Sequence, residues 1–235
     1  MPTLYLIPTP IADNALHTLP GQVLEVVRRL EVFVVERAKT ARHFVKATGP
    51  LRPLQELVFV ELPREGGLGE AEAVLTAALA AGRDVGLLSE AGCPGVADPG
   101  AAVVAWAHGV GMPVEPLVGP SSILLALMAS GMNGQQFCFH GYLSPKRPEL
   151  AKDLRRLEQA MRQSGATQLF METPYRSHMV LDVAKETLQG QTHFGVAQDL
   201  TGPSRRIVVQ SVEQWRKSGI QVVDNRPAVF LVGRH

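Results

Sequence analysis

The sequence has 235 residues, of which 46% are hydrophobic and 19% charged, and its formal net charge is +1. This composition excludes a disordered or fibrous chain, and the near-zero charge gives no general electrostatic argument for nucleic-acid binding. Cys93 and Cys138 lie far apart in the sequence, which indicates neither a disulfide framework nor a zinc site, and no apolar run reaches the roughly 18 residues of a membrane helix. We therefore expect a soluble protein of the reducing cytoplasm, with no disulfide, metal site or membrane span.

Short apolar or β-branched runs in the first half of the chain predict strands at 4–7, 32–35, 57–62, 85–88 and 114–118. Apolar periodicity and runs of small residues predict helices between them at 22–30, 69–81 and 101–107. This alternation is typical of βαβ units and a mostly parallel sheet.

A second series of elements begins near residue 137 and follows a predicted helix at 122–130. Its predicted strands are 137–141, 168–172, 194–200, 207–210 and 228–232, and its predicted helices are 149–162, 178–188 and 212–217. We therefore predict an α/β protein of two domains with mixed sheets, residues 1–120 and 121–235, and a ligand cleft between them.

The segment from Ser89 to Gly100 follows the predicted strand at 85–88 and contains three glycines and two prolines separated by small residues. Ligands of open α/β sheets bind at the carboxyl ends of strands, and such a loop lets a ligand approach bare backbone. Glu90 and Asp98 add hydrogen-bond acceptors there. The segment is equally compatible with a tight connection in which Asp98 caps the next helix.

Three further strand ends are rich in Gly, Pro or hydroxyl residues: 7–11, 119–122 and 171–176. Alone, each has an ordinary interpretation, since Ser121 or Ser122 could cap a helix and Glu172 could be a strand-end acceptor paired with Arg176. Together, the four loops predict a shared site. The sequence has no Walker loop, no Gly-x-Ser-x-Gly elbow and no His-Glu-x-x-His helix, which removes the main support for nucleotide-triphosphatase and hydrolase functions.

Five motifs occur in the order in which one known family carries them. They are Leu-Tyr-Leu-Ile-Pro-Thr-Pro-Ile at 4–11, the segment 89–100, Val-Gly-Pro-Ser-Ser at 118–122, Phe-Cys-Phe-His-Gly-Tyr at 137–142 and Glu-Thr-Pro-Tyr-Arg at 172–176. The series resembles the tetrapyrrole methylase superfamily, and within it the branch of small-subunit ribosomal RNA cytidine 2′-O-ribose methyltransferases. The resemblance spans nearly the whole chain. It implies an enzyme that binds S-adenosylmethionine in the cleft between two α/β domains, usually as a homodimer.

Position-by-position matching to these motifs implies cofactor contacts from Pro8, Glu90, Ala91, Gly92, Asp98, Pro120, Ser121, Ser122, Glu172, Thr173 and Leu200. Methyl transfer from a sulfonium depends mainly on positioning and needs no metal. A ribose hydroxyl has a high pKa and needs a base, for which Glu36 and Asp13 are the catalytic candidates. Both are equally compatible with solvated carboxylates at strand ends.

Several segments depart from the branch pattern, among them Ala12–Asn14 and Arg37–Arg42, which we expect to be loops on the substrate side. Two alternatives therefore stay open: a small-molecule or tetrapyrrole methyltransferase, and a cofactor-binding, RNA-associated module without turnover. Two basic groups favour ribosomal RNA or the small ribosomal subunit as partner: Arg37, Lys39 and Arg42, and Lys146, Arg147, Lys152, Arg155 and Arg156. In the second group, interleaved carboxylates could instead pair with the cations at helical spacing.

Overall fold

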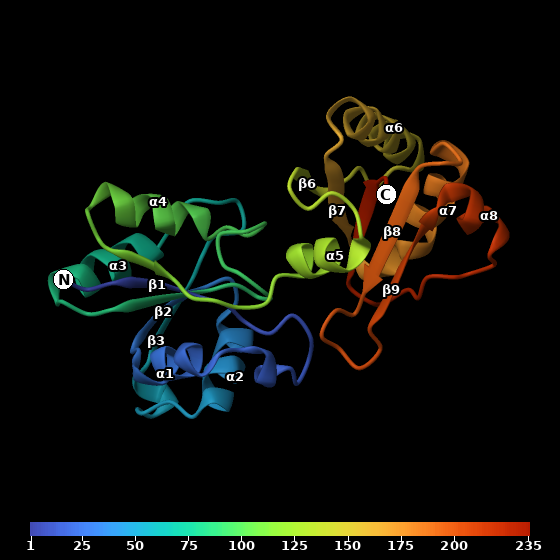
Figure 1. Ribbon diagram of the computed structural model, residues 1–235. Helices are drawn as coiled ribbons and strands as arrows, with labels where there is room; N and C mark the ends of the chain where they lie inside the picture. Colours follow the sequence, from blue (N-terminus) through green and yellow to red (C-terminus); the bar gives the residue numbers. More distant parts are fainter. The chain divides into compact units, whose positions relative to one another are not determined.

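The computed structural model describes residues 1–235 and divides into two compact units, Met1–Ser121 and Ser122–His235 (Figure 1). Each unit contains one five-stranded sheet with helices packed on it. No helix combines the length and the apolar character that crossing a bilayer requires.

The first unit alternates strands and helices along the chain. Its strands are β1 (Leu4–Ile7), β2 (Val32–Val35), β3 (Val58–Glu61), β4 (Val85–Leu88) and β5 (Val114–Pro116). Its helices are α1 (Gly21–Arg29), α2 (Ala38–Thr48), α3 (Ala71–Ala80) and α4 (Ala101–Gly109), with short 3-10 turns η1 (Leu16–Thr18) and η2 (Leu54–Glu56).

The first sheet is parallel throughout, with strand order β3-β2-β4-β1-β5. Alternate residues of each strand enter opposite cores, as Val34 and Phe33 do on β2. Helices α1 and α2 pack in the core that contains Phe33, and α3 and α4 pack in the core that contains Val34. Because all five strands run the same way, their carboxyl ends lie at one edge of the sheet.

The second unit begins with α5 (Ser122–Ser130) and contains a mixed sheet. Its strands are β6 (Phe137–Tyr142), β7 (Thr167–Glu172), β8 (His193–Gln198), β9 (Arg206–Ser211) and β10 (Ala228–Gly233). Its other helices are α6 (Arg147–Ser164), α7 (Ser177–Thr187) and α8 (Val212–Lys217), and η3 (Pro174–Arg176) is a 3-10 turn.

The second sheet has the order β6-β7-β10-β8-β9, in which only the β6–β7 pair is parallel. Helices α6, α7 and α8 share one apolar core with it, around Phe170, Phe194 and Phe230. The buried Trp215 of α8 donates its Nε1–H to the carbonyl of Phe194 at 2.8 Å, which fixes this helix against β8.

The structure corrects the sequence predictions in three places, one of which is the predicted strand at 114–118, since β5 ends at Pro116. Residues 37–42 are not a loop, since α2 begins at Ala38 and buries Ala38, Ala41 and Val45 at helical spacing. The predicted strand at 194–200 ends at Gln198, because Asp199 turns into a left-handed conformation with φ of 50°. The two-domain α/β fold itself is as predicted.

Candidate functional site

The loops that leave β1 and β4 lie at a switch point of the first sheet. The two strands are hydrogen-bonded neighbours, yet the chain passes from β1 to α1 on one face and from β4 to α4 on the other. In open α/β sheets this divergence leaves room for a ligand outside the carboxyl ends of the strands. The segments 8–11 and 89–100, both singled out from the sequence, are these two loops.

Backbone hydrogen bonds join the two loops directly. The Thr9 N–H donates to the Gly92 carbonyl at 2.9 Å, and the Gly92 N–H donates to the Thr9 carbonyl at 3.1 Å. The buried hydroxyl of Ser89 also donates to the Gly92 carbonyl, at 3.0 Å, and the Thr9 hydroxyl donates to the Ser89 carbonyl at 3.3 Å. These bonds fix the loops as one unit, and neither Thr9 nor Ser89 was among the predicted site residues.

The loop after β5 packs against the same pair of loops. A Cβ added at Gly119 would lie 2.2 Å from Cβ and Cγ of the buried Pro8, so only glycine permits this approach. Gly92 has a φ of +80°, and a Cβ there would lie 3.3 Å from Ile11 and 3.4 Å from the Pro120 carbonyl. Three of the four predicted loops therefore meet at the carboxyl edge of the first sheet.

Glu36 and Glu90 lie together beside these loops, at the ends of the neighbouring strands β2 and β4. Glu36 Oε1 accepts a hydrogen bond from the Glu90 N–H at 2.8 Å. Burial raises the pKa of the Glu36 carboxyl, and the negative charges of Asp98 and Glu90 add to the rise, whereas the Glu90 N–H and Arg37 oppose it. A carboxylate with a raised pKa is a stronger base at neutral pH.

Asp98 organises its own loop. Its Oδ1 accepts hydrogen bonds from the N–H groups of Gly95 at 2.7 Å and Gly100, the N-cap of α4, at 2.8 Å. Burial raises the pKa of Asp98, and these two hydrogen bonds only partly offset it. Asp98 is not the cap of α4 that the sequence left open, since Gly100 is the N-cap and the helix has no side-chain cap hydrogen bond; the carboxylate instead has two partners within its own loop.

In the second unit, Glu172 ends β7 in a buried ion pair. Its Oε2 lies 3.0 Å from Nη1 of Arg176 without hydrogen-bond geometry, so the two charges attract but no hydrogen bond forms at that oxygen. Oε1 accepts hydrogen bonds from the N–H of Thr173 at 2.7 Å and from its hydroxyl at 3.2 Å. The interpretation of Glu172 as a strand-end acceptor paired with Arg176 is therefore correct, although the pair is buried.

The turn after β8 contains a strained backbone and an orphaned hydroxyl. Asp199 and Thr201 have φ values of 50° and 66°, which is rare for a β-branched residue such as Thr. Thr201 Oγ1 is buried and has no hydrogen-bond partner, and Leu200 beside it is 7% exposed. Strain of this kind concentrates at ligand sites, and a buried hydroxyl without a partner lacks a hydrogen bond that a ligand could supply. Sequence reasoning predicted Leu200 and missed Thr201.

The other predicted residues have less defined surroundings. Ala91 is exposed beside Gly92, Ser121 ends the loop after β5, and Ser122 begins α5. Asp13 is exposed in the loop after β1, and its carboxylate forms no hydrogen bond or ion pair. The structure therefore gathers Glu36, but not Asp13, into the cluster at the strand ends.

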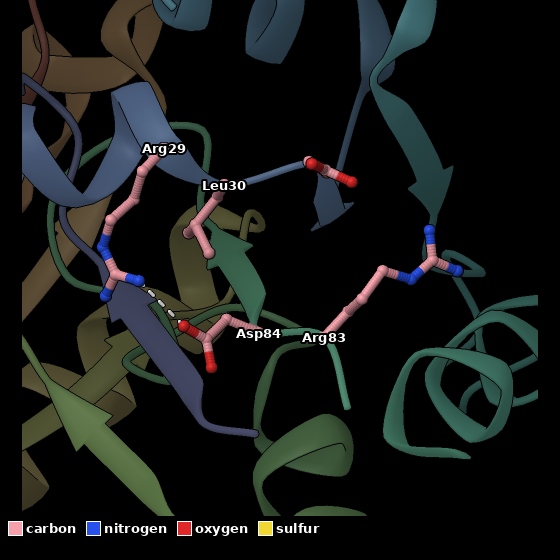
Figure 2. A pocket seen from close by; sticks show the side chains of 5 residues that line it. Arg29, Leu30, Arg83 and Asp84 are labelled. Atoms are coloured by element: carbon pink, nitrogen blue, oxygen red, sulfur yellow. Dashed lines mark hydrogen bonds and ion pairs between the residues drawn. The ribbon is translucent and has the colours of Figure 1, made fainter. Parts of the chain in front are cut away.

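A small pocket lies at the opposite edge of the first sheet, at the amino ends of β2 and β4 (Figure 2). It is lined by Arg29, Leu30, Glu31, Arg83 and Asp84. Arg29 and Asp84 form an ion pair of 2.9 Å there, drawn as the dashed line in Figure 2. This pocket shares no residue with the strand-end loops.

Comparison with known proteins is consistent across sequence and structure. The family model "Tetrapyrrole (Corrin/Porphyrin) Methylases" matches residues 3–215. Proteins named ribosomal RNA small subunit methyltransferase I from Mesorhizobium japonicum and Bacillus subtilis are 36% and 29% identical, over 85% and 86% of this chain. The chain spans only 64% of the length of each of these two relatives.

Solved structures show the same fold at lower identity. The methyltransferase CobJ has a TM-score of 0.64 at 21% identity, and the match covers 100% of this chain and 95% of that one. Uroporphyrin-III C-methyltransferase from Thermus thermophilus, complexed with S-adenosyl homocysteine, has a TM-score of 0.55 at 18% identity, over 98% and 97% of the two chains.

Proposed function

This chain belongs to the tetrapyrrole (corrin/porphyrin) methylase family, and on that premise we propose that it is an S-adenosylmethionine-dependent methyltransferase of ribosomal RNA. The proposed acceptor is a ribose 2′-hydroxyl. The relatives named ribosomal RNA small subunit methyltransferase I support RNA as the substrate class. The observation that carries the proposal is the meeting of three glycine- and proline-rich loops at the switch point of the first sheet.

The residues of these loops fit the cofactor that the family implies. The absence of side chains at Gly119 and Gly92 lets the three loops pack closely, and the N–H and C=O groups of Gly92 are already bonded to Thr9, so the amino-acid and adenosine parts would contact the surface of the loops beside Gly92. On this proposal, Pro8, Ala91, Gly92 and Pro120 surround the ligand on the first unit, and Ser121 and Ser122 supply hydroxyl groups. Glu90 and Asp98 stabilise the same loops by hydrogen bonds. Glu90 bonds to Thr40 and Glu36, and Asp98 bonds to Gly95 and Gly100.

On the second unit, the proposal includes Thr201 as well as Leu200. The buried hydroxyl of Thr201 has no partner within the protein, so a hydrogen bond to the cofactor would satisfy it. Glu172 and Thr173, also predicted from the motifs, would act mainly by fixing the end of β7, since their side chains already bond to each other.

The cofactor supplies an activated methyl group on a sulfonium, so the protein has to position the acceptor oxygen in line with it. We assign Glu36 as the group that takes the hydroxyl proton while the new carbon–oxygen bond forms and the carbon–sulfur bond breaks. The hydrogen bond from the Glu90 N–H holds Glu36 in place, and the raised pKa of Glu36 strengthens it as a base. Asp13 is the second candidate, because its exposed carboxylate is free to approach an acceptor.

The proposal extends to partners and place of action. We propose the small ribosomal subunit or its RNA as the macromolecular partner, a homodimer as the assembly and the cytoplasm as the compartment. The names of the relatives support the ribosomal partner, whereas the homodimer and the cytoplasm extend the expectations drawn from the sequence.

The test is methyl transfer by the purified protein from labelled S-adenosylmethionine. Small ribosomal subunits lacking ribose methylation, total RNA and a metabolite extract would be offered in parallel, and the product nucleosides separated after digestion. Label in a 2′-O-methylnucleoside of small-subunit RNA supports the proposal. Label only in small molecules would favour a tetrapyrrole or other small-molecule methyltransferase, and no label anywhere would favour a module without turnover.

A further inference from the structure

Helix α2 has one strongly basic face. Its exposed cationic and imidazole side chains recur at i, i+3, i+4 and i+7: Lys39, Arg42, His43 and Lys46. This spacing places them on one side of the helix, while Ala41 and Val45 are buried on the other. The helix has no acidic residue from Ala38 to Thr48. We call the four residues the α2 stripe.

The cations of the α2 stripe are not neutralised within the protein. Lys39, Arg42 and Lys46 form no ion pair and no side-chain hydrogen bond. Unpaired cations on one face give a positive surface that keeps its attraction for an external anion.

The second basic group of the sequence differs in this respect. Three of its cations pair with carboxylates: Arg147 with Glu186 at 2.6 Å, Lys152 with Glu149 at 2.9 Å and Arg156 with Asp153 at 3.3 Å. The Lys152–Glu149 and Arg156–Asp153 pairs have the helical spacing expected from the sequence, whereas Glu186 lies on α7. The structure thus favours α2 over α6 as an anion-binding surface.

Two contacts join α2 to its neighbours in the first unit, one to β3 and one to the loop after β4. The Arg42 guanidinium lies over the Phe59 ring of β3, 5.1 Å from its centroid, which limits the freedom of its side chain. In the first turn of α2, the Thr40 hydroxyl donates to Glu90 Oε1 at 2.5 Å. Lys39, the first residue of the stripe, is therefore adjacent to Thr40, whose side chain is bonded to the loop that also binds Glu36.

The length of the stripe suits a nucleic-acid backbone. Lys39 and Lys46 are seven residues apart, which is about 10 Å along the helix. Phosphates on one strand of a duplex are spaced about 3.4 Å along its axis, so the stripe reaches several consecutive phosphates. Arg42 can contact phosphate oxygens with two parallel N–H groups.

We propose that the α2 stripe binds the phosphate backbone of the RNA acceptor and directs it toward Glu36 and the adjoining loops. The inference rests on the proposed function for the identity of the polyanion. Its physical basis is the unpaired charge, the helical spacing and the hydrogen bond from α2 to Glu90.

The experiment compares two triple variants with the same change in charge. The stripe variant is Lys39→Gln, Arg42→Gln and Lys46→Gln, and the matched control is Arg147→Gln, Lys152→Gln and Arg156→Gln. Binding of protein-free small-subunit ribosomal RNA is measured over a series of salt concentrations. Thermal unfolding checks that each variant folds, and titration with S-adenosyl homocysteine gives a readout that is independent of RNA.

We expect the stripe variant to bind RNA at least about tenfold more weakly at low salt. The slope of log affinity against log salt concentration should decrease in magnitude by about 2 to 3. The control and the affinity for S-adenosyl homocysteine should stay at the wild-type level. Wild-type RNA binding by the stripe variant, or an equal loss in both variants, would overturn the inference. Unchanged RNA binding with lost binding to phosphatidylserine vesicles would overturn it as well.

Failure of the inference and failure of the proposed function are distinguishable. If the wild-type protein methylates ribosomal RNA and the stripe variant is also active, with RNA binding that depends on salt as in the wild type, only the inference about the α2 stripe is contradicted. If the wild-type protein transfers no methyl group but the stripe variant shows a weaker dependence of RNA affinity on salt, the proposed function is contradicted and the RNA-binding surface is retained.

Discussion

Thr9 and Gly92 exchange two backbone hydrogen bonds, of 2.9 and 3.1 Å, across the gap between the loops that leave β1 and β4. The bridge is isolated, since it lies outside every strand of the sheet. It joins loops that lead to helices on opposite faces, so it holds the switch point of the first sheet in one conformation.

Gly119→Ala tests the contact that brings the third loop to this bridge. The new Cβ would lie 2.2 Å from Pro8, so one of the two loops has to move. We expect the free energy of unfolding to fall by about 1–3 kcal/mol, and the affinity for S-adenosyl homocysteine to fall as well. Gly109→Ala is the control, because a Cβ at the end of α4 meets no atom within 4 Å. Equal unfolding curves for the two variants would contradict the packing argument.

Asp98→Asn tests the effect of burial on the loop carboxylate. The Asn side chain can still accept the hydrogen bonds from Gly95 and Gly100. Because burial raises the pKa of Asp98 in the folded protein, wild-type stability relative to this variant is highest below the ordinary carboxyl pKa. This difference in the free energy of unfolding, wild type relative to variant, should then decrease as pH rises through the raised pKa. Chemical denaturation across this pH range measures the difference, and a wild-type advantage that grows with pH would contradict the prediction.

Glu36→Gln tests the proposed base. The variant keeps an oxygen that can accept from the Glu90 N–H, so cofactor affinity should be unchanged. Loss of the base should slow methyl transfer about 100-fold or more. Wild-type transfer should decline as pH falls through the raised pKa of Glu36, and the variant should lack this acid limb. Glu65→Gln, at an exposed carboxylate, is the control. Equal turnover by the Glu36 variant would exclude Glu36 from the mechanism and leave Asp13 as the candidate.

Thr201→Val tests the orphaned hydroxyl of the second unit. Val has nearly the same shape, and no internal hydrogen bond is lost, so stability should stay the same or rise. If the hydroxyl bonds to the cofactor, affinity for S-adenosyl homocysteine should fall roughly threefold to tenfold. Calorimetry and thermal unfolding on the same sample separate the two effects. Unchanged affinity would remove Thr201 from the proposed site.

The sequence predicted the regular elements well where the pattern was unambiguous. The buried runs Leu4–Ile7, Val32–Val35 and Val85–Leu88 are strands with the predicted bounds. Helix α2 was missed because its buried face begins with two alanines, Ala38 and Ala41, which carry a weak hydrophobic signal. The central place of β10 between β7 and β8 could not be read from local pattern, since it depends on pairing between distant segments.

The site was predictable as a set of loops but not as a set of contacts. Composition identified the glycines and prolines at strand ends, because few other residues permit such turns. It could not show that Asp98 bonds to its own loop or that Glu172 is buried with Arg176, since both depend on side-chain directions. Thr201 offered no signal beyond its place in the turn after β8, because its strained backbone and lost hydrogen bond appear only in three dimensions.

The central claim is that the bridged loops of the first unit bind S-adenosylmethionine, and calorimetric titration of three proteins tests it most directly. Gly92→Ala and Gly95→Ala introduce the same methyl group at glycines with φ of +80° and +82°, so the backbone strain of an alanine at positive φ is similar in the two variants. Only at Gly92 does the new Cβ press on Ile11 and Pro120; at Gly95 it meets no atom within 4 Å. We predict that wild-type protein and Gly95→Ala bind S-adenosylmethionine and S-adenosyl homocysteine, and that Gly92→Ala loses most of this affinity. Folded wild-type protein that binds neither ligand, or equal affinities for the two variants, would contradict the account.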